Sequence, residues 1–399
     1  MSLQPVGGEP EQLSCEGEGA SERPPGEGAY LHAIQLALPE HAISAADAEA
    51  RLRAGFEAAG EDPSTIAGVF EHAGIAQRHL AKPPAFYLEQ RGLTARNGAY
   101  AEVAPQLAID AARRALDAAG LTPADVDLVI DTSCTGVLIP ALDVYVANAL
   151  GLRKDVRRVP LTEAGCAAGA TALGLARDLL AASARSEAAR AHPNGPQALG
   201  TTALVICVEL PSLTLQLHDT SRANLISSAI FGDGASAAVV TDRPPQGPAL
   251  ELLAHRSVLF PDSQDVMGFD LKTEGFQIVL SPRIPLLVRR NLREEVDAFL
   301  DGLEVDGEPV SLERLELFVL HPGGTKVLDN LRDVLGLDEH AVRHSRGVLR
   351  DCGNLSSASV FYVAQRTLAE GAFRPGALGL LCAMGPGFTV ELLLVRALG

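Results

Sequence analysis

The chain has 399 residues, of which 47% are hydrophobic and 21% are charged, and its formal net charge is −17. This composition is typical of a chain that folds around a large core, and it excludes disorder for most of the sequence. A strongly acidic chain repels phosphate backbones, and no basic stripe interrupts the acidity. We therefore expect no nucleic-acid partner.

The cysteines and apolar runs indicate the compartment. Six cysteines are scattered without a CxxC pair, which predicts reduced thiols. The glutamate-rich N-terminus lacks the basic and apolar regions of a signal peptide. The longest nearly uncharged stretch, 377–390, is shorter than the ~20 residues of a membrane helix and contains Gly385 and Pro386. We expect a cytoplasmic protein without a membrane span and, with no HExxH motif, without a metal site.

The predicted elements follow an α/β pattern in chain order. Residues 1–28, rich in Gly, Glu, Pro and Ser, are predicted to form a disordered tail. From Tyr30 onward, β-rich runs alternate with Ala/Leu/Arg-rich helical runs, and 186–200 has the composition of a surface loop. The clearest predicted elements are helix 106–119, strand 126–131, helix 166–182, strand 203–208, strand 317–321, helix 356–369 and strand 378–382.

Two parts of the chain repeat one order of elements. Cys166 follows the strand end at Thr132 by 34 residues, and Asn354 follows the strand end at His321 by 33 residues. In both parts a glycine precedes the residue that opens the next helix, and a further strand follows. The repeat predicts two duplicated α/β halves, 29–242 and 243–399. Such halves would bring Cys166, His321 and Asn354 together near the axis between them.

Three residues in these repeats are candidates for chemistry. Cys166 lies in the first turn of a predicted helix among small residues, where the helix N-terminus is expected to lower the pKa of the thiol. His321 follows an apolar strand and precedes Pro-Gly-Gly, and Asn354 precedes a helix. Each has a structural alternative: a buried cysteine, a structural histidine and an ordinary helix N-cap.

Together the three residue types favour acyl chemistry. A thiolate is the nucleophile, an imidazole lies beside it, and an amide donates to a developing oxyanion. The chain has no GxxxxGK[ST] and no GxGxxG after a strand, so P-loop and Rossmann functions lose their usual support. A cysteine hydrolase would use the same residue types. Spacing alone does not choose between hydrolysis and acyl transfer.

Five motifs in register make the resemblance specific. They are the segments 162–169 (TEAGCAAG), 230–235 (IFGDGA), 321–324 (HPGG), 353–358 (GNLSSA) and 385–388 (GPGF). Their order and spacing resemble those of type III polyketide synthases, the chalcone synthase family, as a bacterial-type member. The resemblance runs from about residue 30 to the C-terminus. It implies a thiolase-like fold of two duplicated halves in a five-layered αβαβα arrangement, a homodimer, and a Cys-His-Asn site reached by a CoA tunnel.

The resemblance also implies roles. Cys166, in the N-terminal half, would hold the starter and then the growing polyketide as a thioester. In the C-terminal half, His321 would form an ion pair with the thiolate and, with Asn354, bind the thioester carbonyl of malonyl-CoA during decarboxylation. The implied reaction is a decarboxylative Claisen condensation, followed by cyclisation to a resorcinol- or phloroglucinol-like aromatic or an α-pyrone. No metal or redox cofactor is implied.

An alternative is a ketoacyl-synthase-III-like acyltransferase or a thioesterase that does not extend its substrate iteratively. The implied substrate pocket departs from plant members at several positions. Phe231 resembles a gatekeeper, Ile278 replaces the second gatekeeper Phe, and Ile139 lies in the segment that crosses the dimer. Cys134 would line the pocket, or alternatively carry an acyl group. The expected pocket residues are Cys134, Thr135, Ile139, Thr214, Phe231, Phe269, Ile278, Ser356, Met384 and Pro386.

The tunnel entrance is the largest mismatch. Plant members place basic residues near the segment that matches 70–75, where they meet CoA phosphates. Here the segment reads Phe-Glu-His-Ala-Gly-Ile, so His72 is a weak CoA-binding candidate. Two hypotheses follow: an acyl carrier protein delivers the starter thioester, or other arginines hold CoA.

Overall fold

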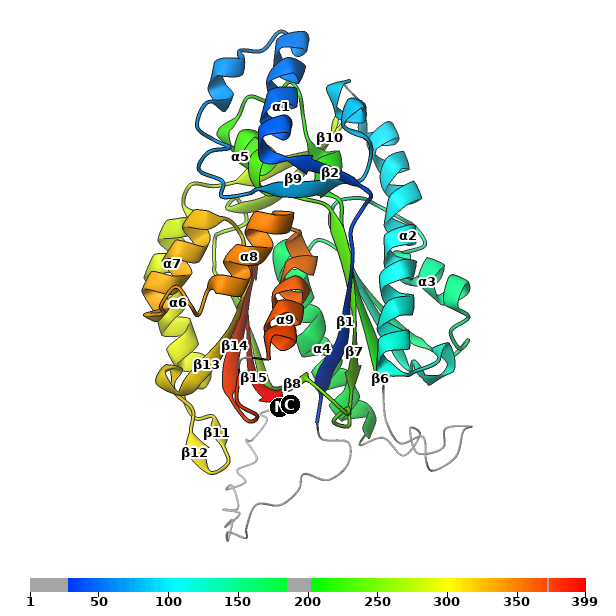
Figure 1. Ribbon diagram of the computed structural model, residues 1–399, viewed down its shortest axis with the longest axis vertical. Coiled ribbons are helices and arrows are strands. Elements are labelled where there is room, and N and C mark those ends of the chain that lie inside the picture. The colour runs from blue at the N-terminus through cyan, green and yellow to red at the C-terminus, as the bar shows by residue number, and fades with distance from the viewer. Residues whose placement is uncertain (1–27, 90, 185–201, 372) are drawn as a thin grey trace, which may run out of the picture.

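The computed structural model describes residues 28–89, 91–184, 202–371 and 373–399 (Figure 1). The predicted tail lies outside the described residues except for Gly28, and so does the predicted loop 186–200. In the described part of the chain, no helix is both long and apolar enough to cross a membrane.

One sheet runs through the molecule in the order β13-β14-β15-β8-β1-β7-β6-β4-β5. It is continuous, but β8 and β1 share only two residue pairs, Tyr30 with Glu251 and Leu31 with Leu250. The sheet therefore divides at this junction into two parts. The bounds of the strands are Leu315–Leu320 (β13), Leu378–Gly385 (β14), Thr389–Leu398 (β15), Ala249–Leu259 (β8), Tyr30–Ala37 (β1), Gly234–Thr241 (β7), Thr202–Glu209 (β6), Leu128–Thr132 (β4) and Arg157–Leu161 (β5).

The two parts have the same topology. In the first, β4 is parallel to β6, β6 is antiparallel to β7, and β7 is antiparallel to β1. In the second, β13 is parallel to β14, β14 is antiparallel to β15, and β15 is antiparallel to β8. The predicted duplication is confirmed, with β5 as an added outer strand in the N-terminal half. The division at 242/243 falls between β7 and β8, and as a domain boundary it stays a prediction.

Helices fill the space between and outside the two sheet parts, and five layers result (Figure 1). Helices α4 and α9 lie in the middle, α2 and α3 cover the N-terminal part, and α6 and α7 cover the C-terminal part. Three apolar clusters occupy the spaces between these layers. The bounds are Leu93–Ala119 (α2), Leu142–Leu150 (α3), Ala168–Ala184 (α4), Ile284–Leu300 (α6), Thr325–Leu335 (α7), Arg343–Cys352 (α8) and Ser359–Glu370 (α9).

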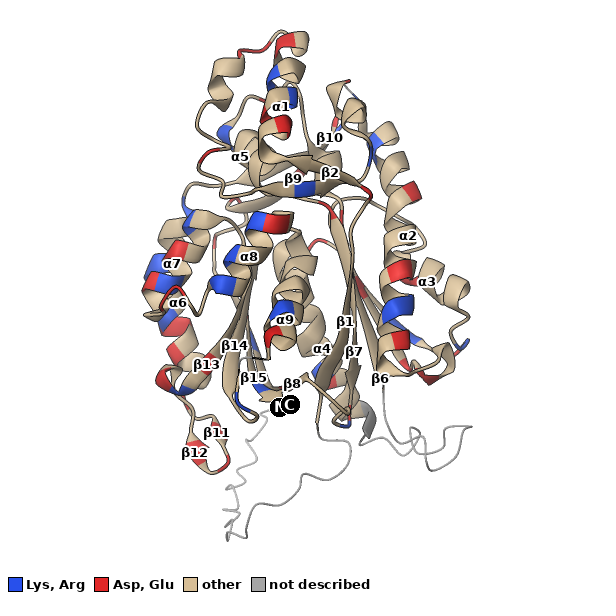
Figure 2. Cartoon of the chain, viewed as in Figure 1, with Lys and Arg blue, Asp and Glu red and all other residues tan. Residues whose placement is uncertain are grey.

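The sequence explains why these layers form. Every residue of β6 and of β14 is buried, because apolar runs without alternation suit strands that are covered on both faces. Charged residues lie mainly on the helices, and most of the central strands are uncharged (Figure 2). Helix α2 presents a stripe of buried alanines to the sheet and ends at Gly120 in the left-handed conformation.

The predicted start of α2 at residue 106 was wrong. The helix begins at Leu93 and includes Pro105, which is buried within it. A proline inside a helix removes one backbone hydrogen bond and normally marks an end, so the sequence pattern favoured a later start. Here the long apolar face of α2, packed on β7 and β6, outweighs that local cost.

The remaining elements gather at the end of the molecule toward which β6 and β13 run (Figure 1). Helix α5 and the hairpin of β9 and β10 lie there beside α1, the β2–β3 pair and short 3₁₀ turns. Their bounds are His41–Ser44 (β2), Ala45–Ala59 (α1), Pro63–Ile66 (η1), Gln77–Leu80 (β3), Pro84–Leu88 (η2), Pro211–Thr214 (η6), Arg222–Ile230 (α5), Met267–Lys272 (β9) and Gly275–Leu280 (β10). Away from this end, η3 (Pro123–Asp125), η7 (Leu312–Arg314) and the small pair β11 (Glu304–Val305) and β12 (Glu308–Pro309) complete the described elements.

The middle helices touch where each begins. Both open with a 3₁₀ turn, Gly165–Ala167 (η4) before α4 and Ser356–Ala358 (η8) before α9. A Cβ atom on Gly169 would lie 2.2 Å from the carbonyl oxygen of Ser357, and backbone cannot yield as a side chain does. The glycine therefore sets how closely the two halves approach.

We predict that Gly169→Ala lowers the free energy of unfolding by about 1–3 kcal/mol, because the added methyl forces α4 away from η8. Gly98→Ala in α2 is the matched control, since a Cβ atom added there would have no atom within 4 Å. It should leave stability unchanged or raise it by up to about 1 kcal/mol through helix propensity. Urea unfolding of both variants tests this, and equal midpoints would contradict it.

Candidate active site

Cys166 lies in η4, at the start of the central helix of the N-terminal half. Its side chain is buried, and its Sγ donates to the Oγ of Ser356 at 3.4 Å. Gly165, with φ of +54°, adopts a left-handed conformation that favours glycine. A Cβ there would come within 2.6 Å of Pro386, so the absence of a side chain lets the Gly385-Pro386 segment pack beside the cysteine.

His321 lies directly after β13. Its backbone N–H donates to the carbonyl of Cys382 on β14 at 2.8 Å, which fixes it at the carboxyl end of two parallel strands. The imidazole is 2% exposed, and its Nδ1 has no hydrogen-bond partner among the described residues. Burial lowers the pKa of His321 to about 4.

Asn354 connects the other two candidates. Its Oδ1 accepts from the backbone N–H of Ser356 at 2.8 Å, and its Nδ2 lies 3.5 Å from the carbonyl oxygen of Gly323. The side chain therefore reaches the Ser356 that binds Cys166 and the Pro-Gly-Gly loop that follows His321. The structure brings the three predicted residues into one region through Ser356 and Gly323.

The backbone of Asn354 is held by the other half. Its N–H donates to the carbonyl of Ile230 at 2.7 Å, and its carbonyl accepts from Gly232 at 3.0 Å. A Cβ on Gly232 would lie 2.2 Å from the carbonyl oxygen of Cys352, so this crossing requires glycine. The IFGDGA segment thus positions Asn354 and places Phe231 beside it.

Two buried charged residues, Arg78 and Asp233, fix the segment 230–235. The guanidinium of Arg78 donates to the carbonyls of Ser228 and Phe231, the latter at 3.1 Å. Asp233 accepts from the backbone N–H groups of Ala81 at 2.6 Å and Ser212 at 2.8 Å. Burial raises the pKa of Asp233 to about 7 despite these bonds. Neither residue touches Cys166, and both act as positioning residues for Phe231.

A buried carboxylate, Glu209, is the site residue that sequence reasoning missed. It ends β6 and has 0% exposure. Its oxygens accept from Thr135 Oγ1 at 3.0 Å, the Cys134 N–H at 3.1 Å, Ser357 Oγ at 2.7 Å and Ser356 Oγ at 3.3 Å. A glutamate directly after an uninterrupted apolar strand was the available signal, because charged residues are rarely buried without a partner.

The predicted lowering of the Cys166 pKa was wrong. Burial raises the pKa of its thiol to about 12, and the negative charge of Glu209 adds to the increase. The helix N-terminus does not compensate, because the thiol has lost its hydration and the helix opens with a 3₁₀ turn. The shifts at Cys166 and His321 favour a neutral thiol and a neutral imidazole in the free protein, rather than the predicted ion pair.

The predicted pocket residues fall into two groups near this centre. Cys134, Thr135 and Ser356 belong to the Glu209 network, and the Cys134 Sγ lies 3.9 Å from Ser356 Oγ. Burial and Glu209 raise the pKa of the Cys134 thiol, which favours pocket lining over acyl transfer. The second group comes from three elements near one another in the chain's cap region. Thr214 ends η6 and Phe231 follows α5, while Phe269 and Ile278 are cross-strand partners in the β9–β10 hairpin.

The other predicted residues lie at the margins. Met384 on β14 is buried in the apolar cluster of the C-terminal half, while Pro386 abuts Gly165. Ile139 is 93% exposed, so it does not line a pocket of its own chain. His72 is exposed, with its Nδ1 2.5 Å from the carbonyl oxygen of Gly68.

Comparison with known proteins identifies the family. The model for the N-terminal domain of chalcone and stilbene synthases matches residues 38–244, and the model for their C-terminal domain matches 251–399. The chain belongs to the chalcone and stilbene synthase family. It is therefore a type III polyketide synthase, an acyltransferase with the thiolase-like fold, as the motifs indicated.

Three relatives illustrate the similarity. A 1,3,6,8-tetrahydroxynaphthalene synthase of Streptomyces peucetius subsp. caesius is 37% identical over 374 residues, which cover 92% of this chain and 93% of that protein. A phloroglucinol synthase of Pseudomonas fluorescens is 32% identical, with 80% and 85% covered. The tetrahydroxynaphthalene synthase from Streptomyces coelicolor A3(2), whose crystal structure is known, has 30% sequence identity to this chain. The two structures superpose with a TM-score of 0.82 over 93% of this chain and 99% of that one.

The pKa of Cys166 makes a testable prediction about the free synthase. Alkylation of Cys166 by iodoacetamide, followed by peptide mass spectrometry, should still accelerate at pH 10, because the thiol has a pKa of about 12. Glu209→Gln should shift the curve to lower pH by removing a nearby negative charge. Glu57→Gln on the exposed face of α1 is the control. A plateau near pH 7 would instead demonstrate a thiolate–imidazolium pair.

Proposed function

We propose that this synthase extends an acyl starter with malonyl-CoA by decarboxylative Claisen condensation on Cys166. The observation that carries the proposal is the convergence of Cys166 with Asn354 and the His321 loop through Ser356 and Gly323. Family membership supports the reaction class. The chemistry draws on these side chains and the thioesters, so we infer no requirement for a metal or redox cofactor.

Loading begins from the neutral pair. The thiol of Cys166 attacks the carbonyl carbon of the starter thioester, and its proton passes to the imidazole of His321, which burial keeps neutral and able to accept. The carrier thiolate leaves and takes up the proton. The products are an acyl-Cys166 thioester and the free carrier thiol, and His321 is neutral again.

Extension follows on the acylated enzyme. The carboxylate of malonyl-CoA leaves as carbon dioxide, and the electron pair forms an enolate whose oxygen accepts hydrogen bonds from Asn354 and His321. The enolate carbon then attacks the acyl carbonyl, and the Cys166 thiolate leaves. One fixed donor to such an oxyanion accounts for roughly 10²–10³ in rate. The burial of Asn354 and His321 strengthens these hydrogen bonds, because less water screens them.

We infer a polyhydroxylated aromatic as the product. The relatives support this inference, because they include tetrahydroxynaphthalene, phloroglucinol and 3,5-dihydroxyphenylacetyl-CoA synthases. Mass spectrometry of products from labelled malonyl-CoA and a panel of acyl-CoAs tests this. An α-pyrone would change the cyclisation assignment, and no release of carbon dioxide would favour a non-extending acyltransferase or thioesterase.

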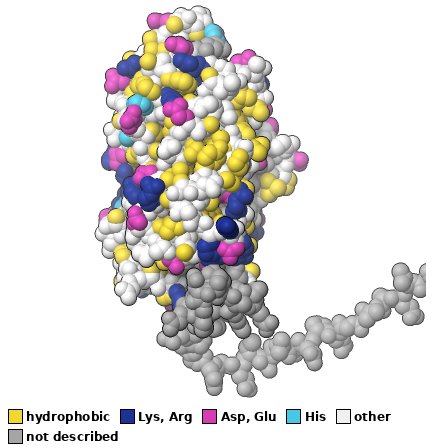
Figure 3. All heavy atoms as spheres, turned by 90° about the vertical axis from the view of Figure 1, so that its right-hand side faces the viewer, with side chains coloured by type: hydrophobic (Ala, Val, Ile, Leu, Met, Phe, Trp, Pro, Cys, Tyr) yellow, Lys and Arg dark blue, Asp and Glu magenta, His cyan; other side chains and the backbone are white. Residues whose placement is uncertain are grey.

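We also propose a cytoplasmic homodimer. The reduced state of the five described cysteines supports the compartment. Figure 3 views the side with α2 and α3, where apolar side chains form a band. Val137, Ile139 and Tyr145 are exposed, and β5 is one of the two edge strands of the sheet in the described part of the chain. An exposed apolar face beside an open sheet edge favours self-association about a twofold axis.

We predict that Cys166→Ala reduces product at least about 10³-fold, because no nucleophile remains to hold the chain. Circular dichroism should remain unchanged, since the substitution removes one buried sulfur. Cys352→Ala, at the end of α8, is the matched control and should keep full activity. Product formation by the Cys166 variant at the normal rate would refute the assignment.

The dimer proposal predicts a mass of about twice 41.8 kDa by light scattering. Ile139→Asp should weaken association at least about tenfold, because a large exposed apolar side chain buries at the interface in both copies. Leu286→Asp on α6 is the control, as its leucine is exposed on the opposite outer layer. Equal dissociation constants for the two variants would exclude Ile139 from the interface.

A further inference from the structure

A cavity with mainly apolar walls lies at the end of the molecule that carries α1 and α5 (Figure 1). Its walls come from α1, β2, β3, η2, η6 and α5, and the Phe231 that follows α5 forms part of them. Cys166, His321 and Asn354 are not among its lining residues. The cavity is therefore separate from the candidate active site.

Helix α1 presents one face to this cavity. Ala48, Arg51 and Leu52 line it, with the i, i+3 and i+4 spacing that places residues on the same side of a helix. Ala48 is only partly buried, and it packs at the edge of the apolar cluster of the C-terminal half. Its small side chain leaves room that a larger residue would fill.

The polar groups deep in the lining are already engaged within the protein. The hydroxyl of Tyr87 lies 2.7 Å from Ser212 Oγ, and the guanidinium of Arg78 donates to the carbonyl of Phe231 at 3.1 Å. The nearby buried Asp233 offsets part of the charge of Arg78. The inner end of the cavity therefore favours apolar carbon over a charged headgroup.

A cation without a partner lies at the mouth of the cavity. Arg51 is exposed, and within the described residues its guanidinium forms no hydrogen bond or ion pair. The two acidic residues closest to it in the sequence have other partners. Asp47 accepts from the hydroxyl of Ser44 at 2.7 Å, and Glu49 binds Arg53 at 2.7 Å. The mouth thus combines an uncompensated positive charge with apolar walls.

We propose that this cavity binds a short-chain aliphatic carboxylic acid, which slows the synthase by restraining Phe231. The chain packs inside, and the carboxylate pairs with Arg51 at the mouth. The cavity encloses about 80 Å³, equal to about three water molecules in the liquid, so it admits a chain of a few carbons and excludes a long one. Because the backbone of Phe231 pairs with that of Asn354, restraint of Phe231 reaches a candidate catalytic residue directly.

Ligand-observed NMR titration with the sodium salts of the straight-chain acids from acetate to octanoate tests the binding. Affinity should rise about fourfold for each methylene that the cavity buries, and octanoate should bind no more tightly than the best shorter acid. Affinity that does not depend on chain length would overturn the inference.

Two substitutions locate the acid in the cavity. Ala48→Leu fills the space and Arg51→Gln removes the cation, so each should weaken binding at least about fivefold. Ala54→Leu on the exposed face of α1 and Arg113→Gln on α2 are the matched controls, and both should bind the acid as wild type does. Unchanged affinity in Ala48→Leu and Arg51→Gln would also overturn the inference.

Steady-state kinetics with malonyl-CoA test the effect on rate, which rests on the proposed function, whereas the binding does not. The best-bound acid, at saturation, should lower kcat at least about twofold with KM unchanged, and should have little effect on the Ala48→Leu variant. A raised KM with unchanged kcat would place the acid in the substrate tunnel and contradict the proposal. Bound acid with no change in kcat would overturn the role of Phe231. A wild-type protein that binds the acid but releases no carbon dioxide from malonyl-CoA would instead refute the proposed function.

Discussion

The active site depends on backbone-to-backbone contact between the two halves. Gly169 meets the Ser357 carbonyl and Gly232 meets the Cys352 carbonyl at separations that leave no room for a Cβ atom. Hydrogen bonds of Asn354 to Ile230 and Gly232 cross the same seam. Because main chain cannot repack as side chains do, these crossings place a residue of each half at a fixed separation. The set of candidate catalytic residues therefore forms only where the halves meet, because Cys166 comes from the N-terminal half and His321 and Asn354 come from the C-terminal half.

Glu209 imposes the second constraint. A carboxylate with no exposure is tolerated because hydroxyls, a thiol and a backbone N–H surround it, and two of those hydroxyls come from the C-terminal half. The network holds Ser356, which holds the Cys166 thiol. Its charge also opposes formation of a thiolate. The site therefore combines rigid placement of the sulfur with a neutral resting thiol, and in the proposed mechanism the thiol loses its proton to His321 only when substrate is bound.

The sequence allowed prediction of the α/β class, the duplication and the convergence of Cys166, His321 and Asn354, because periodicity and repeated glycine-bounded helix starts are local signals. The start of α2 was missed, since tertiary burial outweighed the local effect of Pro105. The lowered pKa of Cys166 was wrong for a related reason. A helix start is visible in a sequence, whereas the burial that raises the pKa of this thiol, and the negative charge of Glu209 that adds to the increase, arise only in the folded chain. The role of Glu209 could not be predicted, because its hydrogen-bond partners come from segments far away in the sequence.

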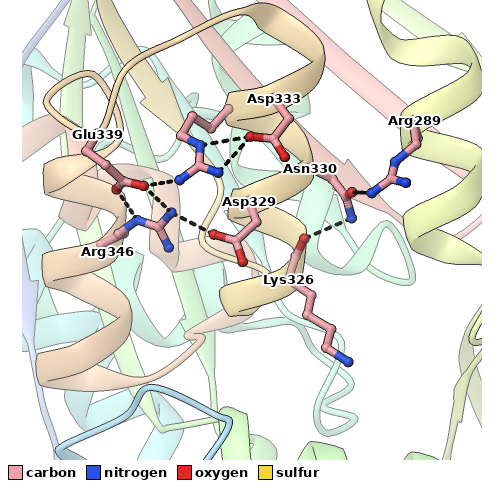
Figure 4. Close-up of polar contacts among 8 residues, drawn as sticks. Arg289, Lys326, Asp329, Asn330, Asp333, Glu339 and Arg346 are labelled. Carbon is pink, nitrogen blue, oxygen red and sulfur yellow. Dashed lines mark hydrogen bonds and ion pairs between the residues drawn. The ribbon is translucent and has the colours of Figure 1, made fainter.

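The charge of the chain is balanced locally on the outer face of α7. A net charge of −17 opposes anionic thioesters at long range, but at physiological salt that field fades beyond about 8 Å. The affinity for such thioesters is then decided by charges close to the bound substrate. On α7 and α8, Arg332 and Arg346 bind Asp329, Asp333 and Glu339, and they reduce the negative charge of that face (Figure 4). An acidic protein can in this way lower its local negative charge without changing its overall charge.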